Sequence, residues 1–138
     1  MSSFSLALRA STVCLCLLAG SSAQAQSWQM NTQSLALKSG ESTEVSDIYW
    51  VVNCKSLLTS PPEVTILDGP PGVTATIAEA MVLPRFQQCP KPVAGGKLSV
   101  AAGTIDDQSN SLMNVRIRYK TRDGVRDKSM TFTIALFP

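Results

Sequence analysis

The sequence contains no histidine, the side chain on which many hydrolytic and metal sites depend. Ser-His-Asp catalysis, Cys-His catalysis and histidine metal sites are therefore excluded. Glutamates that could form a carboxylate pair for glycoside hydrolysis are scattered, at Glu41, Glu44, Glu63 and Glu79. The sequence also has no nucleophile elbow, phosphate-binding loop or dinucleotide fingerprint. We therefore expect no enzymatic activity and no cofactor.

Cations lie at alternate positions near the C-terminus. Arg116, Arg118 and Lys120 alternate with apolar residues, so a strand would place all three on one face. Such a stripe raises the local concentration of anions and could bind an anionic envelope polymer. Exposed strand faces are ordinarily charged, so a merely solvated surface is the alternative. Nucleic acid is not expected, because Tyr119 is the one aromatic residue near this face that could stack on a base.

Residues 84–96 form a second candidate binding site. Their sequence, PRFQQCPKPVAGG, predicts a long irregular loop that displays Arg85 and Phe86 close to Cys89. Loops of more than about 12 residues without regular structure are often functional. A disulfide at Cys89 would hold this loop in shape, as an inhibitor of a secreted or envelope hydrolase requires. The alternative is that Phe86 packs onto the edge of the domain and the prolines only stiffen a connection.

The first 25 residues resemble a targeting segment. A short start containing Arg9 precedes an apolar stretch, and small residues ending in Ala23-Gln24-Ala25 follow it. This order is typical of a secretory signal peptide that is cleaved before Gln26. Its apolar core is far shorter than the roughly 20 residues that cross a membrane. We therefore predict a periplasmic or secreted protein without a membrane span.

Two cysteines, Cys54 and Cys89, remain in residues 26–138. An exported chain meets oxidising conditions, so we predict an intramolecular disulfide between them. Their separation of 35 positions gives a loop-closure stabilisation of roughly 3 to 4 kcal/mol. Two cysteines without histidine do not complete a zinc site. Asp106 and Asp107 lack the spacing of a calcium loop, so no metal site is expected.

Residues 26–138 contain short β-type runs separated by proline and glycine turns. The run at 43–53 includes five consecutive apolar residues and predicts a central strand covered on both faces. Residues 78–83 fit either one helical turn or a strand. Further runs with strand character lie at 35–38, 63–67, 73–77 and 98–101.

The C-terminal residues predict a hairpin. With Asp123-Gly124 as a two-residue turn, paired residue numbers sum to about 247. This register places Val115 opposite Phe132 and Lys120 opposite Asp127, with all apolar pairs on one face.

These elements predict a single all-β domain over residues 26–138, a small antiparallel β-sandwich with one disulfide. Trp50, Val115, Phe132 and Ile134 are expected in its core. The architecture resembles the immunoglobulin-like class, although Trp50 precedes Cys54 and does not lie between the two cysteines. The expected function is an exported, non-catalytic binding or interaction module of unknown ligand. The sequence does not identify its partner, and the candidates are an envelope protein and an anionic envelope polymer. A hydrolase inhibitor that uses the 84–96 loop is the alternative.

Overall fold

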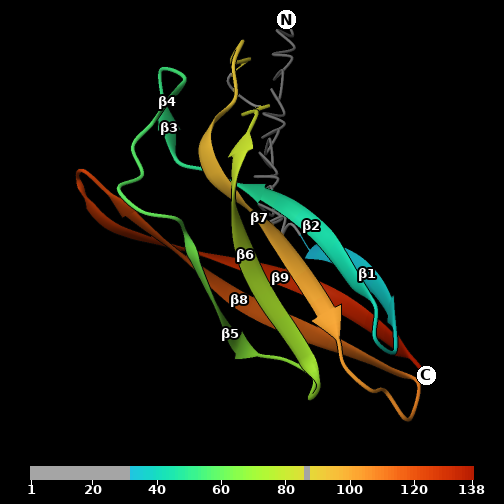
Figure 1. Cartoon of the computed structure of the whole chain (residues 1–138). Helices are drawn as coiled ribbons and strands as arrows, with labels where there is room; N and C mark the ends of the chain where they lie inside the picture. The colour runs from blue at the N-terminus through green and yellow to red at the C-terminus, as the bar shows by residue number, and fades with distance from the viewer. Residues whose placement is uncertain (1–31, 86–87) are drawn as a thin grey trace, which may run out of the picture.

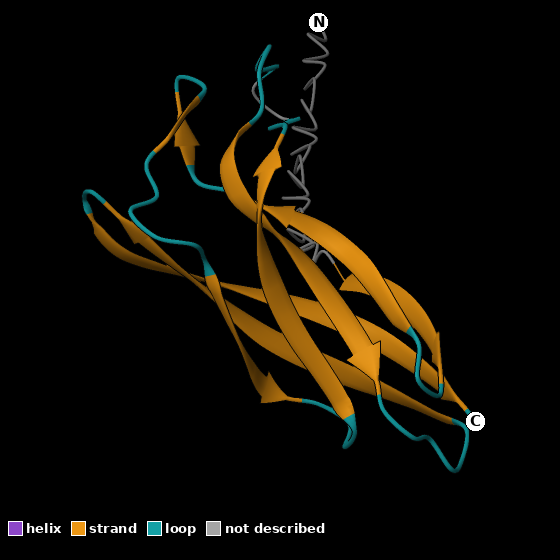
Figure 2. Ribbon diagram, viewed as in Figure 1, coloured by secondary structure: helices purple, strands orange, loops and turns teal. Residues whose placement is uncertain are grey.

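The computed structural model describes residues 32–85 and 88–138, and it is built from strands without a helix in those residues (Figures 1 and 2). The prediction of an all-β fold is therefore confirmed. Within the described residues, no helix is long and apolar enough to cross a membrane. The strands are β1 (Thr32–Lys38), β2 (Ser42–Ile48), β3 (Val51–Val52), β4 (Lys55–Ser56), β5 (Glu63–Asp68), β6 (Val73–Val82), β7 (Val93–Ala102), β8 (Ser109–Thr121) and β9 (Gly124–Phe137).

The strands form two larger sheets and one short hairpin. One sheet has the order β1-β9-β8-β5, the second has the order β2-β7-β6, and β3 pairs with β4. The second sheet lies over the first, and their strands cross at an angle (Figure 1). β1 runs parallel to β9, which departs from the predicted antiparallel arrangement, whereas the other strand pairs of the described residues are antiparallel. Parallel pairing is possible here because the chain passes through the other sheet before it returns as β9.

Both sheets contribute to one hydrophobic core. Leu98 and Val100 of β7 face Val115 of β8 and Phe132 and Ile134 of β9, and all five are fully buried. Three of the four predicted core residues are thereby confirmed at its centre. Trp50 is only partly buried and packs at the margin of the core. Its ring lies 5.1 Å from that of Tyr119, and the Lys128 ammonium lies 4.8 Å from the Trp50 ring centroid.

The C-terminal hairpin forms, but its predicted register is wrong by two residues. Thr121 pairs with Gly124, so Arg122 and Asp123 form the tip. Gly124 alone at this turn has a positive φ, of 111°. The expected Asp-Gly turn needs positive φ at both of its central residues, and Asp123 does not have it. A shift of two preserves the faces of a strand, which explains why the predicted core residues are still buried.

Three predictions about individual segments need correction or completion. The run at 43–53 is not one central strand, because β2 lies at a sheet edge and Val52 is half exposed. Residues 78–83 are resolved in favour of a strand, since β6 continues to Val82. The irregular segment expected at 84–96 is shorter, because β7 begins at Val93.

Candidate functional site

The disulfide joins two loops at one end of the domain. Cys54 lies in the turn between β3 and β4, and Cys89 lies in the segment between β6 and β7. Their Cα atoms are 5.4 Å apart, which confirms the predicted pairing. The Ser56 hydroxyl donates a hydrogen bond of 3.0 Å to the Ala94 carbonyl, so the β3–β4 hairpin is also tied to β7. We call this region the disulfide end, defined by residues 49–56, 81–85 and 88–92.

Backbone conformations that side chains disfavour gather at the disulfide end. Within the described residues, three residues other than glycine have a positive φ: Asn53 at 51°, Cys54 at 60° and Gln88 at 49°. All three lie at or beside a half-cystine. Asn53 and Cys54 are the two residues between β3 and β4, and a two-residue hairpin turn of type I′ requires a positive φ at both, which asparagine adopts more readily than most residues. Gln88 lies beside Cys89, so the disulfide joins two segments that both carry positive φ.

Aliphatic side chains are exposed next to these loops. Val52 is 50% exposed, Met81 63% and Leu83 47%. They amount to half of the large exposed apolar residues in the described chain; the others are Leu67, Leu112 and Val125. Val52 and Met81 belong to the same end, because Met81 pairs with Ala94, whose carbonyl accepts the hydrogen bond from Ser56. Exposed apolar groups next to a rigid loop are typical of protein-binding surfaces.

A pocket of about 400 Å³ opens beside Leu83 and Arg85. Its remaining lining comes from Tyr49 and from the outer part of β2: Glu44, Val45, Ser46 and Asp47. A register shift between Glu44 and Ser46 interrupts β2 here. Such a bulge bends a strand and redirects its side chains. The pocket therefore combines aliphatic, carboxylate and guanidinium groups.

A close backbone contact places Tyr49 at this pocket. Any Cβ at Gly95 would clash with the carbonyl oxygen of Ile48 and with the side chain of Val82. It would also lie 3.4 Å from the Cβ of Tyr49. Only glycine at this position lets the chain after β2 cross so closely over β7.

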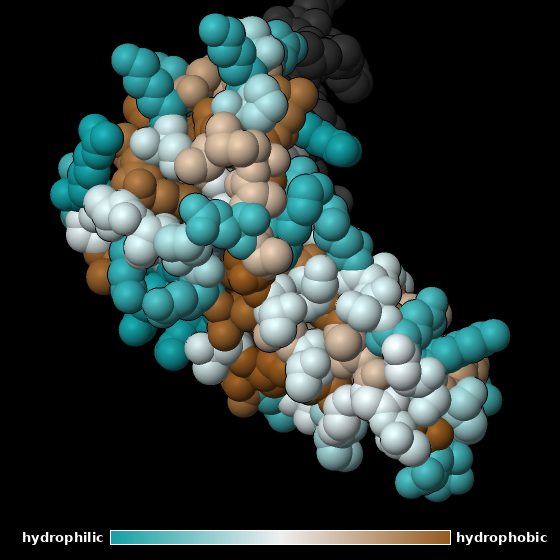
Figure 3. All heavy atoms as spheres, in the orientation of Figure 1, coloured by the Kyte–Doolittle hydropathy of each residue, from teal (hydrophilic) through white to brown (hydrophobic). Residues whose placement is uncertain are grey.

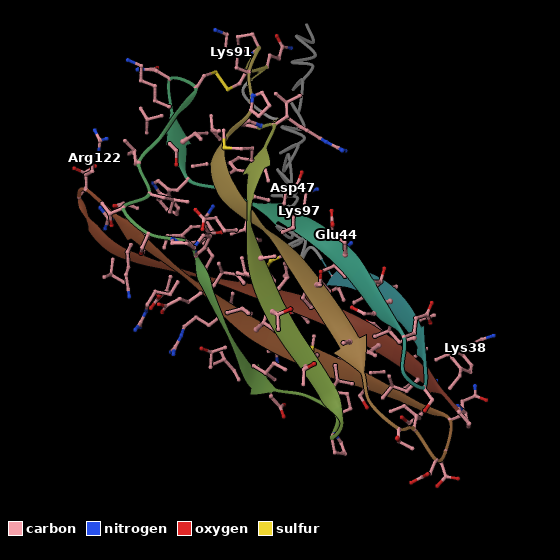
Figure 4. All side chains as sticks on the ribbon, viewed as in Figure 1. Lys38, Glu44, Asp47, Lys91, Lys97 and Arg122 are labelled. Atoms are coloured by element: carbon pink, nitrogen blue, oxygen red, sulfur yellow. A yellow bond between two sulfur atoms is a disulfide. The ribbon has the colours of Figure 1, made fainter. Side chains whose placement is uncertain are left out.

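The two pocket carboxylates share one cation. The Lys97 ammonium lies 2.8 Å from a Glu44 oxygen and 3.4 Å from an Asp47 oxygen, as Figure 4 shows for the three labelled side chains. The hydrogen bond that Lys97 donates to Glu44 and the negative charge of Asp47 raise the pKa of Lys97. Arg85 forms no ion pair with any described residue. Among the described residues that line the pocket, Arg85 therefore supplies a guanidinium without an ion-pair partner, a group that suits a carboxylate.

Phe86, predicted to act together with Arg85, lies outside the described residues. Arg85 itself is exposed and lines the pocket. The structure thus places Arg85 in one pocket with Tyr49 and β2, a proximity that the sequence did not predict.

The predicted basic face is present, but its cations are mostly paired. Arg118 donates two hydrogen bonds to the Asp127 carboxylate, at 3.0 and 3.1 Å. These bonds lower the pKa of Asp127 and raise the pKa of Arg118. Lys120 lies 3.1 Å from Glu63 of β5 and not opposite Asp127, so that predicted pair is wrong. Arg116 lies opposite uncharged residues, Ser129 and Thr65.

Because Arg118 and Lys120 are in ion pairs, the outer face of the hairpin has little excess positive charge. An anion that bound to it would compete with the two carboxylates for Arg118 and Lys120. Asp106 and Asp107, the weaker candidates for calcium, belong to no group of three potential metal ligands in residues 32–85 and 88–138.

No protein-family model, curated protein or solved structure matches this chain.

Proposed function

We propose that the chain is an exported, non-catalytic binding module with an immunoglobulin-like sandwich fold, and that it binds a protein partner through the disulfide end. The single observation that carries this proposal is that a disulfide joins two loops beside exposed apolar side chains. The Cys54–Cys89 bridge links the β3–β4 turn to the segment before β7, next to exposed Val52, Met81 and Leu83. A cross-linked loop loses little conformational entropy when it docks onto a partner.

The chemistry of this surface favours a polypeptide over a polymer of uniform charge. Met81 and Leu83 offer apolar contact, while Arg85 offers a bidentate donor at the edge of the pocket. Apolar anchors surrounded by polar groups are typical of protein interfaces. By contrast, the basic face of the hairpin has two of its three predicted cations in ion pairs.

Affinity capture from the native envelope tests the proposal. The wild-type chain is compared with Met81→Ser/Leu83→Ser, which makes the disulfide end polar. The matched control is Leu112→Ser/Val125→Ser, since these residues are 60% and 55% exposed on β8 and β9. We expect the first variant to lose the captured partner and the control to retain it. Equal capture by the two variants would contradict the proposed surface.

An inhibitor of a secreted or envelope hydrolase is the second candidate function. The observation that favours it is Arg85, exposed on a segment held by the disulfide four positions later. A pre-organised loop loses little entropy on docking. If this function is correct, the captured partner is a hydrolase, and the wild-type chain inhibits it while Arg85→Ala does not.

Export is part of the proposal and has its own test. The mature protein is expected to begin at Gln26 and to carry no lipid. Intact-mass measurement of protein recovered from outside the cytoplasm decides the matter. A retained Met1 or an added acyl mass would contradict it.

A further inference from the structure

Four edge strands bound the two larger sheets: β1 and β5 in one, β2 and β6 in the other. An edge strand presents backbone N–H and C=O groups without a partner, and it can pair with another chain. Folded proteins block such pairing with bulges, prolines, charged side chains or short strands. The four edges of this domain differ in how far they are blocked.

Three of these edges carry an obstacle or a link. β5 has six residues, an irregular register between Ile66 and Asp68, and proline pairs on both sides. β2 is interrupted by its bulge. The side-chain amide of Gln33 on β1 donates a hydrogen bond of 3.1 Å to the Val45 carbonyl of β2, so these two edges are linked to each other.

β6 lacks the bulges, prolines and short length that block the other edges. It runs for ten residues and pairs with β7 without a register shift, from Val73 opposite Ala102 to Val82 opposite Val93. It contains no proline, lysine or arginine, and its single charged residue is Glu79. Within the described residues, no strand pairs with its other side. β6 is therefore a long, regular and open edge.

An apolar seam follows the same edge. Val64 and Ile66 of β5 and Ala75 and Ile77 of β6 pack against the core but are only partly buried. Leu67 beside them is 52% exposed. Figure 3 shows hydrophobic atoms at the surface between the positions that β5 and β6 occupy in Figure 1. The core is thus incompletely covered where the backbone is also unpaired.

We infer that two copies of this chain associate through their β6 edges, as antiparallel neighbours related by a two-fold axis perpendicular to the sheet. This interaction shares Met81 with the disulfide end, since in the register derived below Met81 faces Val73 of the other copy, but its tests change positions 76 and 78, which lie outside the disulfide end. The result is a continuous six-stranded sheet with the order β2-β7-β6-β6-β7-β2. The symmetry makes the contact self-complementary and closed.

A second copy fits this edge because a single two-fold rotation acts on both the unpaired backbone and the exposed apolar seam. The rotation pairs the open backbone groups of the two β6 strands, and it brings the two apolar seams next to each other. The rotation keeps each strand's inward face inward, so Ile77 and Ala75 of both copies lie on the same side of the joined sheet. The exposed residues that alternate with them, Thr74, Thr76 and Ala78, are small and uncharged and do not obstruct the pairing.

The length of β6 and the position of Glu79 together select the register: an axis at Ile77 or at Ala78 pairs nine residues of each copy, and an earlier axis pairs fewer. Because facing residues must share a side of the sheet, the axis passes through a residue and not between two residues. With Ile77 on the axis, Glu79 faces Ala75 of the other copy, and the two glutamates lie about 14 Å apart along the strands. That separation exceeds the Debye length of about 8 Å at physiological salt. With Ala78 on the axis it shrinks to about 7 Å, and with Glu79 on the axis the like charges face each other.

Sedimentation equilibrium of protein purified from cells that express the full chain tests the association. We expect a reversible monomer–dimer equilibrium for the wild type. Thr76→Lys/Ala78→Lys should weaken it at least about tenfold, because position 76 faces position 78 of the other copy and two like-charged pairs result. The control is Ser34→Lys, which adds a charge to exposed β1 and should leave the equilibrium unchanged. A wild type that stays monomeric up to its solubility limit, or a dimer insensitive to the double substitution, would overturn the inference.

Cross-linking tests the register independently. In the proposed pair, Thr76 of one copy faces Ala78 of the other at a Cα separation of about 4.5 to 5.5 Å, which a disulfide spans. Thr76→Cys/Ala78→Cys should therefore form a covalent dimer on mild oxidation, with positions 76 and 78 linked in the mass map. Each single substitution leaves its two copies about 8 Å apart and should not cross-link. A dimer that cross-links equally well with either single substitution would contradict this register.

Discussion

The outer face of the C-terminal hairpin and the disulfide end are built in opposite ways. On the hairpin, regular strands carry cations whose partners are on neighbouring strands, as in Arg118–Asp127 and Lys120–Glu63. At the disulfide end, short strands and loops carry positive-φ residues and exposed aliphatic side chains around a cystine. Most cations of the hairpin face have ion-pair partners within the domain, whereas the aliphatic side chains of the disulfide end are exposed to solvent.

The comparison shows that a charged stripe in a sequence is weak evidence for a binding site. The sequence predicts the stripe at residues 116–120 because successive side chains of a strand point to opposite faces. Its partners, Asp127 and Glu63, are set by register and by sheet order. The disulfide end is distinguished by the exposure of its aliphatic side chains and of Arg85, and not by a cluster of like charges.

The largest effect on stability is expected on the inner face of the hairpin, where Phe132 is fully buried. Phe132→Ala should lower the free energy of unfolding by about 3–5 kcal/mol, because it removes apolar contact and leaves a cavity. Denaturant titration measures the change, with exposed Thr133→Ala as control. Similar losses for both variants would show that the hairpin does not anchor the core.

Removal of the disulfide should have the next largest effect. Cys54→Ser/Cys89→Ser should cost roughly 3–4 kcal/mol of unfolding free energy through the loop entropy of the unfolded chain. It should also weaken partner binding, because the positive-φ loops lose their constraint. Thiol titration of the unreduced wild type should find no free sulfhydryl. Partner binding that survives the double substitution unchanged would separate the disulfide from the binding surface.

A pH titration examines the junction of the two regions, where Tyr119 of β8 packs against Trp50. Burial and the nearby Tyr49 raise the pKa of Tyr119 to about 12. The fold favours the neutral phenol, so its contribution is intact below the unfolded pKa of about 10 and is lost as the pH rises towards 12. The loss should reach about 3 kcal/mol at most, since each pKa unit corresponds to about 1.4 kcal/mol. Tyr119→Phe should show a shallower alkaline decline; identical declines in the two proteins would contradict this assignment.

The smallest effect is expected on the outer face of the hairpin. The hydrogen bonds from Arg118 lower the pKa of Asp127, so the pair contributes at neutral pH and its contribution is lost as acid protonates Asp127. Because the pair is exposed, Asp127→Asn should change stability less than any substitution above, and less still at high salt. Unfolding measured at low and high salt tests this. A salt-independent loss of stability comparable to that caused by removing the disulfide would show that the Arg118–Asp127 pair contributes more than an exposed ion pair does.

The sequence predicted those features that depend on local alternation. Strand character, the disulfide and the burial of Val115, Phe132 and Ile134 followed from periodicity and cysteine count. A register error of two residues did not disturb these predictions, because it preserves the faces.

Features that depend on distant segments were not predictable in this way. The parallel pairing of β1 with β9 joins the two ends of the described chain. The pocket joins Arg85 to β2 through a bulge and a close approach at Gly95. The glycine pair at 95–96 lies in the segment that the sequence predicts as a loop, whereas it belongs to β7. A glycine pair can equally mark a strand over which another segment crosses closely.

The most direct test of the central claim is the affinity of the captured partner for two variants measured side by side. Met81→Ser/Leu83→Ser changes the disulfide end, and Arg116→Glu/Arg118→Glu reverses charge on the hairpin face. We predict that the first weakens binding about tenfold or more at low and high salt, because it removes apolar contact. The second should change affinity less than about twofold at high salt, where screening suppresses charge effects. Unchanged binding by the first variant, with a salt-dependent loss in the second, would place the binding surface on the hairpin and contradict this account.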